Sequence, residues 1–89
     1  MSEREKFLIV KSCIDQMDYY GLLSRGAPKD EFDLESKEIC ANISYNHSIE
    51  EIADIIASVF NYYFDEHHSA TVFTSVAEQI KNKLSATIK

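Results

Sequence analysis

The chain has 89 residues, of which 45% are hydrophobic and 11% aromatic, and its formal net charge is −6 at pH 7. This length allows one domain, residues 1–89, with a modest core, and the composition excludes a disordered or collagen-like chain. No stretch approaches the ~20 apolar residues that span a bilayer, and the first residues lack the apolar run of a signal peptide, so we expect a cytoplasmic protein.

Charge is unevenly distributed along the chain. Between Asp30 and Glu78 there are eleven acidic residues and one basic residue, Lys37, so this block carries a net charge of −10. Such a block repels the phosphates of nucleic acids and of anionic membranes, so we expect direct binding to neither. A basic protein is the complementary partner, although acidic residues also serve simply to keep a small protein soluble.

The first predicted helix covers residues 3–18. Ser2 followed by Glu5 is a capping-box pattern, in which each residue binds the backbone N–H of the other. Apolar residues recur at helical spacing through this stretch, namely Phe7, Val10, Ile14 and Met17.

A long loop, residues 19–33, follows this helix and holds both glycines and the only proline of the chain. Gly21 and Gly26 permit positive φ, and Pro28 fixes its own φ. Leu22 and Leu23 are expected to be buried. We therefore expect an ordered corner that packs against the helices rather than a solvated loop.

A shorter second helix follows, with Asp33 as its predicted N-cap. Its inward-facing residues are expected to be Leu34, Ile39, Cys40 and Ile43. The two cysteines, Cys13 and Cys40, lie within apolar helical patterns and lack CxxC spacing, which predicts free buried thiols in a reducing compartment.

The third helix has the strongest pattern, because a second capping box, Ser48 with Glu51, precedes the run HSIEEIADIIASVFNYYFDE. At 100° per residue its apolar arc contains Ile49, Ile52, Ala53, Ile56, Val59, Phe60, Tyr63 and Phe64. Ile55 and Tyr62 lie seven residues apart and form an apolar strip beside the acidic side of this helix.

The fourth helix is expected to open near Ser69 or Thr71 and to close at the C-terminal lysines, where Ile88 can extend it. Its core positions are Phe73, Val76, Ala77, Ile80 and Leu84. The β-branched stretch TVFTSV is also compatible with a short strand, but no partner strand is evident. Four helices with short connections predict an all-α, compact four-helix bundle with one long ordered loop between helices one and two.

No motif predicts catalysis, a cofactor or a metal. Gly21 to Gly26 has the glycine spacing of a phosphate-binding loop, but Ala27 and Pro28 stand where Lys and Ser or Thr are required. The acidic run from Asp30 lacks the order of ligands of a calcium-binding EF-hand. His67 and His68 are adjacent, whereas two zinc ligands on one helical face need three or four residues between them. A metal-dependent hydrolase using either histidine is an alternative hypothesis.

The stretch MDYYGLLSRGAPKDEFD, residues 17–33, resembles the hallmark of a small bacterial family of unknown function, the YugE-like family. The family shows an aspartate closing helix one, Gly-Leu-Leu, Gly-Ala-Pro, then Asp-Glu and an aromatic. The similarity extends over residues 14–84, with Met17 and Tyr19 standing where the family often has Trp and Pro. It implies a small helical bundle, and some small acidic proteins with similar loops look like immunity partners of secreted toxins.

These features predict a non-enzymatic acidic module that binds a basic protein. The specific hypothesis is an immunity or antitoxin-type protein that neutralises a basic toxin, such as a nuclease, by covering its active-site cleft. The predicted partner-binding residues are Asp30, Glu31, Asp33, Glu35, Glu51, Asp54, Ile55 and Tyr62. The alternative is a housekeeping regulatory or structural module whose acidic surface serves solubility alone.

Overall fold

The computed structural model describes residues 2–87 and contains four α-helices and no strand within that range. The α-helices are α1 (Glu3–Met17), α2 (Asp33–Asn42), α3 (Ile49–Phe64) and α4 (Thr74–Thr87), and two 3₁₀ turns are η1 (Tyr19–Gly21) and η2 (Ala70–Phe73). The prediction of an all-α four-helix bundle is confirmed. None of the described helices is both long and apolar enough to cross a membrane.

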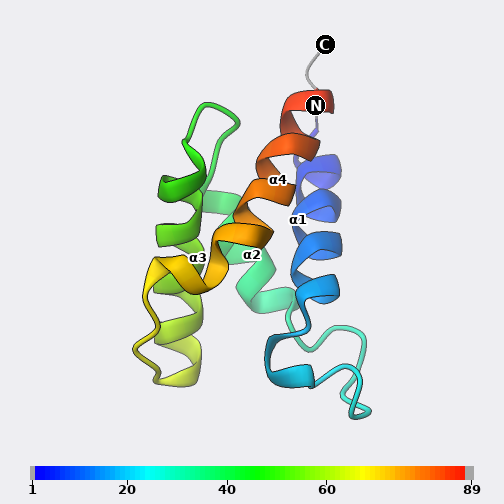
Figure 1. The fold of residues 1–89 in the computed structure, drawn as a ribbon. Coiled ribbons are helices and arrows are strands. Elements are labelled where there is room, and N and C mark those ends of the chain that lie inside the picture. Colours follow the sequence, from blue (N-terminus) through cyan, green and yellow to red (C-terminus); the bar gives the residue numbers. More distant parts are fainter. Residues whose placement is uncertain (1, 88–89) are drawn as a thin grey trace.

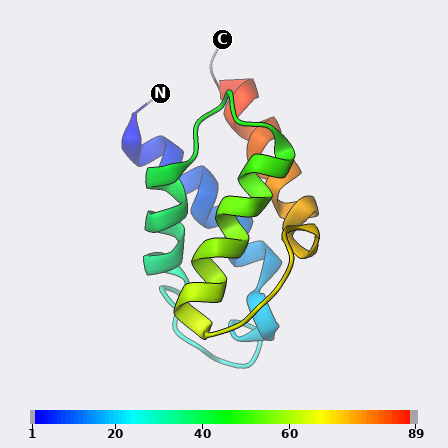
Figure 2. The same cartoon turned by 90° about the vertical axis from the view of Figure 1, so that its left-hand side faces the viewer.

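The helices form a closed ring in which each packs against two neighbours. In Figure 1, α1 and α3 stand on opposite sides, α2 lies behind them and α4 crosses in front. Helix α2 contacts α1 and α3, and α4 contacts the same two helices on the other side. Figure 2 shows α3 nearest the viewer with α2 beside it. One edge of α3 therefore faces α2 and the opposite edge faces α4.

Both predicted capping boxes are present. The Ser48 hydroxyl accepts a hydrogen bond from the Glu51 N–H at 3.1 Å, and the Glu51 carboxylate accepts one from the Ser48 N–H at 2.8 Å. Ser2 and Glu5 make the same reciprocal pair at the start of α1. These bonds satisfy backbone donors that have no partner inside a helix, which explains why α1 and α3 begin where the sequence predicts.

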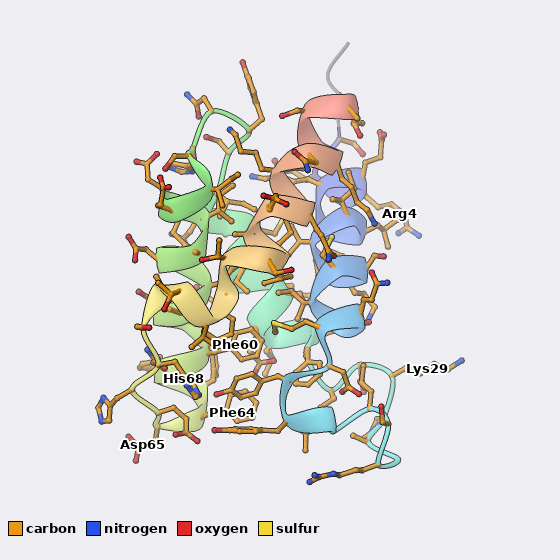
Figure 3. The ribbon with its side chains drawn as sticks, in the orientation of Figure 1. Arg4, Lys29, Phe60, Phe64, Asp65 and His68 are labelled. Carbon is orange, nitrogen blue, oxygen red and sulfur yellow. The ribbon has the colours of Figure 1, made fainter. Side chains whose placement is uncertain are left out.

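The core centres on Phe60 of α3, which is fully buried. Its ring lies 4.6 Å from that of Tyr19 in η1 and 5.6 Å from that of Phe73 in η2, measured between centroids. The rings of Phe32 and Phe64 lie 6.0 and 5.8 Å away. One aromatic side chain thus joins α3 to both 3₁₀ turns and to the segment before α2, and Figure 3 shows Phe60 and Phe64 pointing toward η1.

Helix α2 departs from the prediction at its start. Its N-cap is Phe32, without a side-chain cap, and Asp33 is the first helical residue. Leu34 was expected to point inward but is 64% exposed, whereas Ile39, Cys40 and Ile43 are buried as predicted. On a helix of 3.6 residues per turn Leu34 lies opposite the side that Ile39 and Ile43 share, so all three cannot be buried together.

Three further expectations are corrected. Tyr63 was placed in the core but is 40% exposed. Helix α4 begins at Thr74 after η2, not at Ser69 or Thr71, and the TVFTSV stretch is helical rather than a strand. Ile88 lies outside the described residues. The burial of Cys13 and Cys40 as free thiols and the burial of the five predicted α4 core positions are confirmed.

The corner between α1 and α2 is built around Asp18. Its carboxylate accepts hydrogen bonds from the Leu23 N–H at 2.7 Å and from the Ser24 N–H at 3.0 Å, and the Ser24 hydroxyl adds a third at 2.6 Å. Gly21 and Gly26 have φ of +66° and +102°, as their predicted role requires. Leu22 and Leu23 were expected to be buried and are half-buried, where they pack against the core.

A second set of bonds ties this corner to the segment after α3. The Tyr19 hydroxyl lies 2.7 Å from His68 Nε2, and the Tyr20 hydroxyl donates to the Glu66 carboxylate at 2.9 Å. The Asn61 side chain holds the backbone N–H and C=O of His68, each at 2.9 Å. Tyr20 has φ of +57°, which is uncommon for an aromatic residue, so these bonds fix a conformation that the chain alone would disfavour.

We expect Asp18→Asn to lower the thermal stability at pH 7, because the pKa of Asp18 is lowered by the Ser24 hydroxyl and then by the Leu23 and Ser24 N–H groups. Because the pKa of Asp18 is lower in the folded protein than its ordinary value of 3.8, the ionised carboxylate stabilises the fold above pH 3.8. This stabilisation is lost as the pH falls through the pKa of the folded state. The difference in melting temperature between wild type and variant, followed by circular dichroism, should therefore shrink toward pH 3. Asp54→Asn, at an exposed site, is the control, and an equal loss in both variants would contradict this role.

We expect Tyr19→Phe to reduce the free energy of unfolding by about 1 kcal/mol, because it removes the closer hydroxyl at His68 Nε2 and leaves that atom only the Tyr20 hydroxyl, at 3.4 Å. Chemical denaturation measures this loss. Tyr45→Phe removes the hydroxyl of an exposed side chain and should change stability little. Equal stability of Tyr19→Phe and wild type would show that the bond contributes nothing.

Candidate protein-binding groove

A groove of about 400 Å³ lies between α2 and α3. Its lining residues are Glu38, Ser58, Val59, Tyr62 and Tyr63. Glu38 comes from α2 and the others come from one edge of α3, so the groove follows the line along which the two helices pack. Figure 2 shows this face of the molecule, with α2 and α3 side by side.

Large aromatic surface is exposed in this groove. The Tyr62 side chain is 81% exposed, and its ring stands perpendicular to that of Tyr63 with 5.3 Å between centroids. Leu34, which is exposed, lies one helical turn before Glu38 on α2. Clustered exposed apolar side chains of this size are typical of a binding surface rather than of an ordinary solvated one.

The electrostatic surroundings of the groove are acidic. Burial raises the pKa of the Tyr63 hydroxyl, and the nearby carboxylates of Glu38 and Glu35 raise it further. Glu35 is only 6% exposed, and its Oε1 atom has no hydrogen-bond partner. Burial raises the pKa of Glu35 as well, and the negative charges of Glu31 and Asp33 add to that effect.

The predicted residues of α3 divide between the groove and its surroundings. Tyr62 lines the groove, and Ile55 lies on the same edge of α3, half-buried against the core. Glu51 lies one turn before Ile55, but its carboxylate is engaged in the capping box. Asp54 is exposed and lies about 100° round the helix from Ile55, outside the groove.

The four predicted carboxylates before and within α2 do not form one continuous surface. Asp33 faces α1, where its carboxylate pairs with Lys11, which also pairs with Asp15 at 2.9 Å. Glu35 is buried on the α3 side, because two residues along a helix correspond to about 200° of rotation. Asp30 is exposed in the loop, and Glu31 is half-buried.

Sequence reasoning missed Glu38, Ser58, Val59 and Tyr63 as groove residues. Glu38 follows Glu35 by three residues, so helical spacing alone could have placed both on one side of α2. Tyr63 was assigned to the core because its position lies within the broad apolar arc of α3. Its ring lies at the margin of that arc, where α2 leaves it half uncovered.

The next question is whether the described residues form a metal-binding site. Within residues 2–87 no cluster of three or more His, Cys, Asp or Glu side chains could hold a metal ion. His68 is engaged by Tyr19 and Asn61, and His67 is exposed away from it. The hydrolase stays a hypothesis.

Comparison of the chain with protein-family models, with curated proteins and with solved structures finds no match. The resemblance of residues 17–33 to the YugE-like family stays a prediction. The argument for function therefore depends on the geometry and charge of the groove itself.

We expect Glu35→Gln to stabilise the protein at pH 7, because the fold raises the pKa of this carboxyl above its ordinary value of 4.5. Because the pKa of Glu35 is raised in the folded protein, the fold loses stability as the pH rises from about 4.5 through the pKa of the folded state, where the buried carboxyl ionises. Glutamine cannot ionise, so the variant does not lose this stability. Denaturation curves should show the largest gain at neutral pH and little gain near pH 4. Glu78→Gln on α4 is the exposed control, and a loss of stability in Glu35→Gln at pH 7 would contradict the assignment.

Proposed function

We propose that this protein is an acidic protein-binding module whose partner is a basic protein. The specific form of the proposal is an immunity-type protein that neutralises a cationic toxin, such as a nuclease, by covering its active-site cleft. The observation that carries it is the groove between α2 and α3, where the carboxylate of Glu38 and an exposed tyrosine pair line the same depression.

Among the described residues, the ion pairs involve Lys11 and not the carboxylate that lines the groove. Lys6 donates to the carbonyl of Ile43 at the end of α2, and Lys11 pairs with acidic residues near α1. Lys81 donates to the carbonyl oxygens of Tyr45 and His47. These lysines thus serve the fold, because they satisfy carbonyl groups that a helix end or a turn leaves open.

The only lysine within the acidic block also lies away from the groove. Lys37 lines a different depression, between α1 and α2, together with Glu3 and Arg4. The charge on that side is therefore mixed, whereas the residues that line the α2–α3 groove include one carboxylate, Glu38, and no lysine, arginine or histidine.

Aromatic anchors and acidic surroundings have complementary effects on association. A tyrosine ring supplies contact area at a small cost in side-chain entropy, and it is enriched among the residues that dominate binding energy. Carboxylates around it accelerate encounter with a positively charged partner and disfavour negatively charged ones. A small domain with a thin stability margin also gains stability when a partner binds its folded state.

The test is affinity capture from the producing cell, followed by identification and purification of the partner. We expect a basic protein whose affinity falls by roughly tenfold or more between 50 and 300 mM salt, because salt screens attraction between exposed charges. If the partner is a toxin, an equimolar amount of this protein should abolish its activity.

The control is an unrelated small acidic protein of equal net charge, which should not retain the partner. A partner that is itself acidic, or one bound equally well at both salt concentrations, would contradict the proposal. A partner retained equally by the control protein would show ion exchange rather than recognition, and that result would also contradict it.

A further inference from the structure

We propose that the α2–α3 groove is the docking site for an arginine side chain of the basic partner, which lies against the ring of Tyr62 and pairs with the carboxylate of Glu38. This inference rests on the proposed function and deepens it, since it assigns the contact site and the chemistry of the group that is bound.

The first argument is that the groove combines a cation-binding ring with a carboxylate. Glu38 and the tyrosine pair line the same groove, and the Tyr62 ring is almost fully open to solvent. A cation over a tyrosine face is attracted by the negative charge of the ring system. A carboxylate at the edge of the same groove can accept hydrogen bonds from that cation.

The second argument is the buried carboxyl of Glu35. It lies one helical turn before Glu38, on the side of α2 that faces α3, and its Oε1 atom has no partner within hydrogen-bond distance. A buried polar atom without a partner is costly, and its negative charge reaches the Tyr63 hydroxyl in the groove. Glu35 does not line the groove, but it adds a negative charge behind Tyr63, next to the carboxylate of Glu38 that a bound cation would meet.

Two other depressions between helices differ from this groove in their lining. The depression between α1 and α2 already contains basic residues of its own, Arg4 and Lys37. The depression between α1 and α4 is lined by residues without charge, from Gln16 and Met17 to Gln79. Among these depressions only the α2–α3 groove combines carboxylate, exposed aromatic rings and the absence of a basic lining residue.

Arginine suits this groove better than lysine does. The guanidinium group is planar, stacks on aromatic rings and presents several N–H donors to a carboxylate at once. An ammonium group is a compact, strongly hydrated charge that gives up more of its water on entering a groove. We therefore expect discrimination between the two cations rather than attraction to positive charge in general.

The experiment titrates ¹⁵N-labelled protein with two synthetic peptides, acetyl-(Arg-Ala)₄-amide and its lysine counterpart, and maps the amide shifts. We expect the shifts to concentrate on residues 34–38 and 55–63, with the arginine peptide binding roughly threefold more tightly. Glu38→Gln and Tyr62→Ala should each weaken binding by roughly fivefold or more, as loss of a charge-assisted hydrogen bond or a cation–π contact requires. Tyr62→Phe, which keeps the ring, should retain most of the affinity.

Matched controls are Glu78→Gln on α4 and Tyr45→Ala in the connection between α2 and α3, both exposed and outside the groove. They should change affinity less than twofold. Shifts spread evenly over the acidic surface, or equal losses in the control variants, would overturn this inference while leaving the proposed function standing. Failure of both peptides to bind, together with capture of no basic protein, would overturn the inference and the proposed function alike.

Discussion

The burial of Phe60 is the constraint on which the rest of the structure depends. Its ring contacts rings from η1, η2 and the segment before α2, so the two long connections of the chain are fixed against α3 by a single side chain. Non-helical segments normally gain little stability from hydrophobic burial. Here they do gain stability from it, because their residues Tyr19, Phe32 and Phe73 pack against Phe60. The rest of the core between the four helices is mainly aliphatic, with Ile14, Ile39, Ile56 and Ile80 fully buried.

This arrangement determines which parts of the surface remain available. Because Phe60 and its neighbours turn one side of α3 inward, the edge that carries Tyr62 meets α2 only partly and stays open. Lys6 and Lys81 donate to carbonyl groups near the end of α2, and Lys11 pairs with Asp33 near its start, so these three lysines are engaged away from this edge. The open aromatic edge beside Glu38 is therefore a consequence of how the bundle closes.

Helical periodicity predicted most of the fold but only part of the groove. The capping boxes at Ser2 and Ser48 located the starts of α1 and α3 because they are local backbone interactions. The side of α2 that carries Leu34 depended on how α2 packs between two other helices, which its short and weakly patterned sequence does not specify. For the same reason Asp33 and Glu35, two residues apart in sequence, point to different neighbours.

The central claim is that the edge of α3 bearing Tyr62 contacts a basic partner in the cell. The most direct measurement places the photo-cross-linking residue p-benzoyl-phenylalanine at position 62, with position 45 as the matched exposed tyrosine site, and irradiates the producing cells. The account predicts a cross-link from position 62 to a basic protein and none from position 45. A cross-link from position 45 without one from position 62 would contradict it.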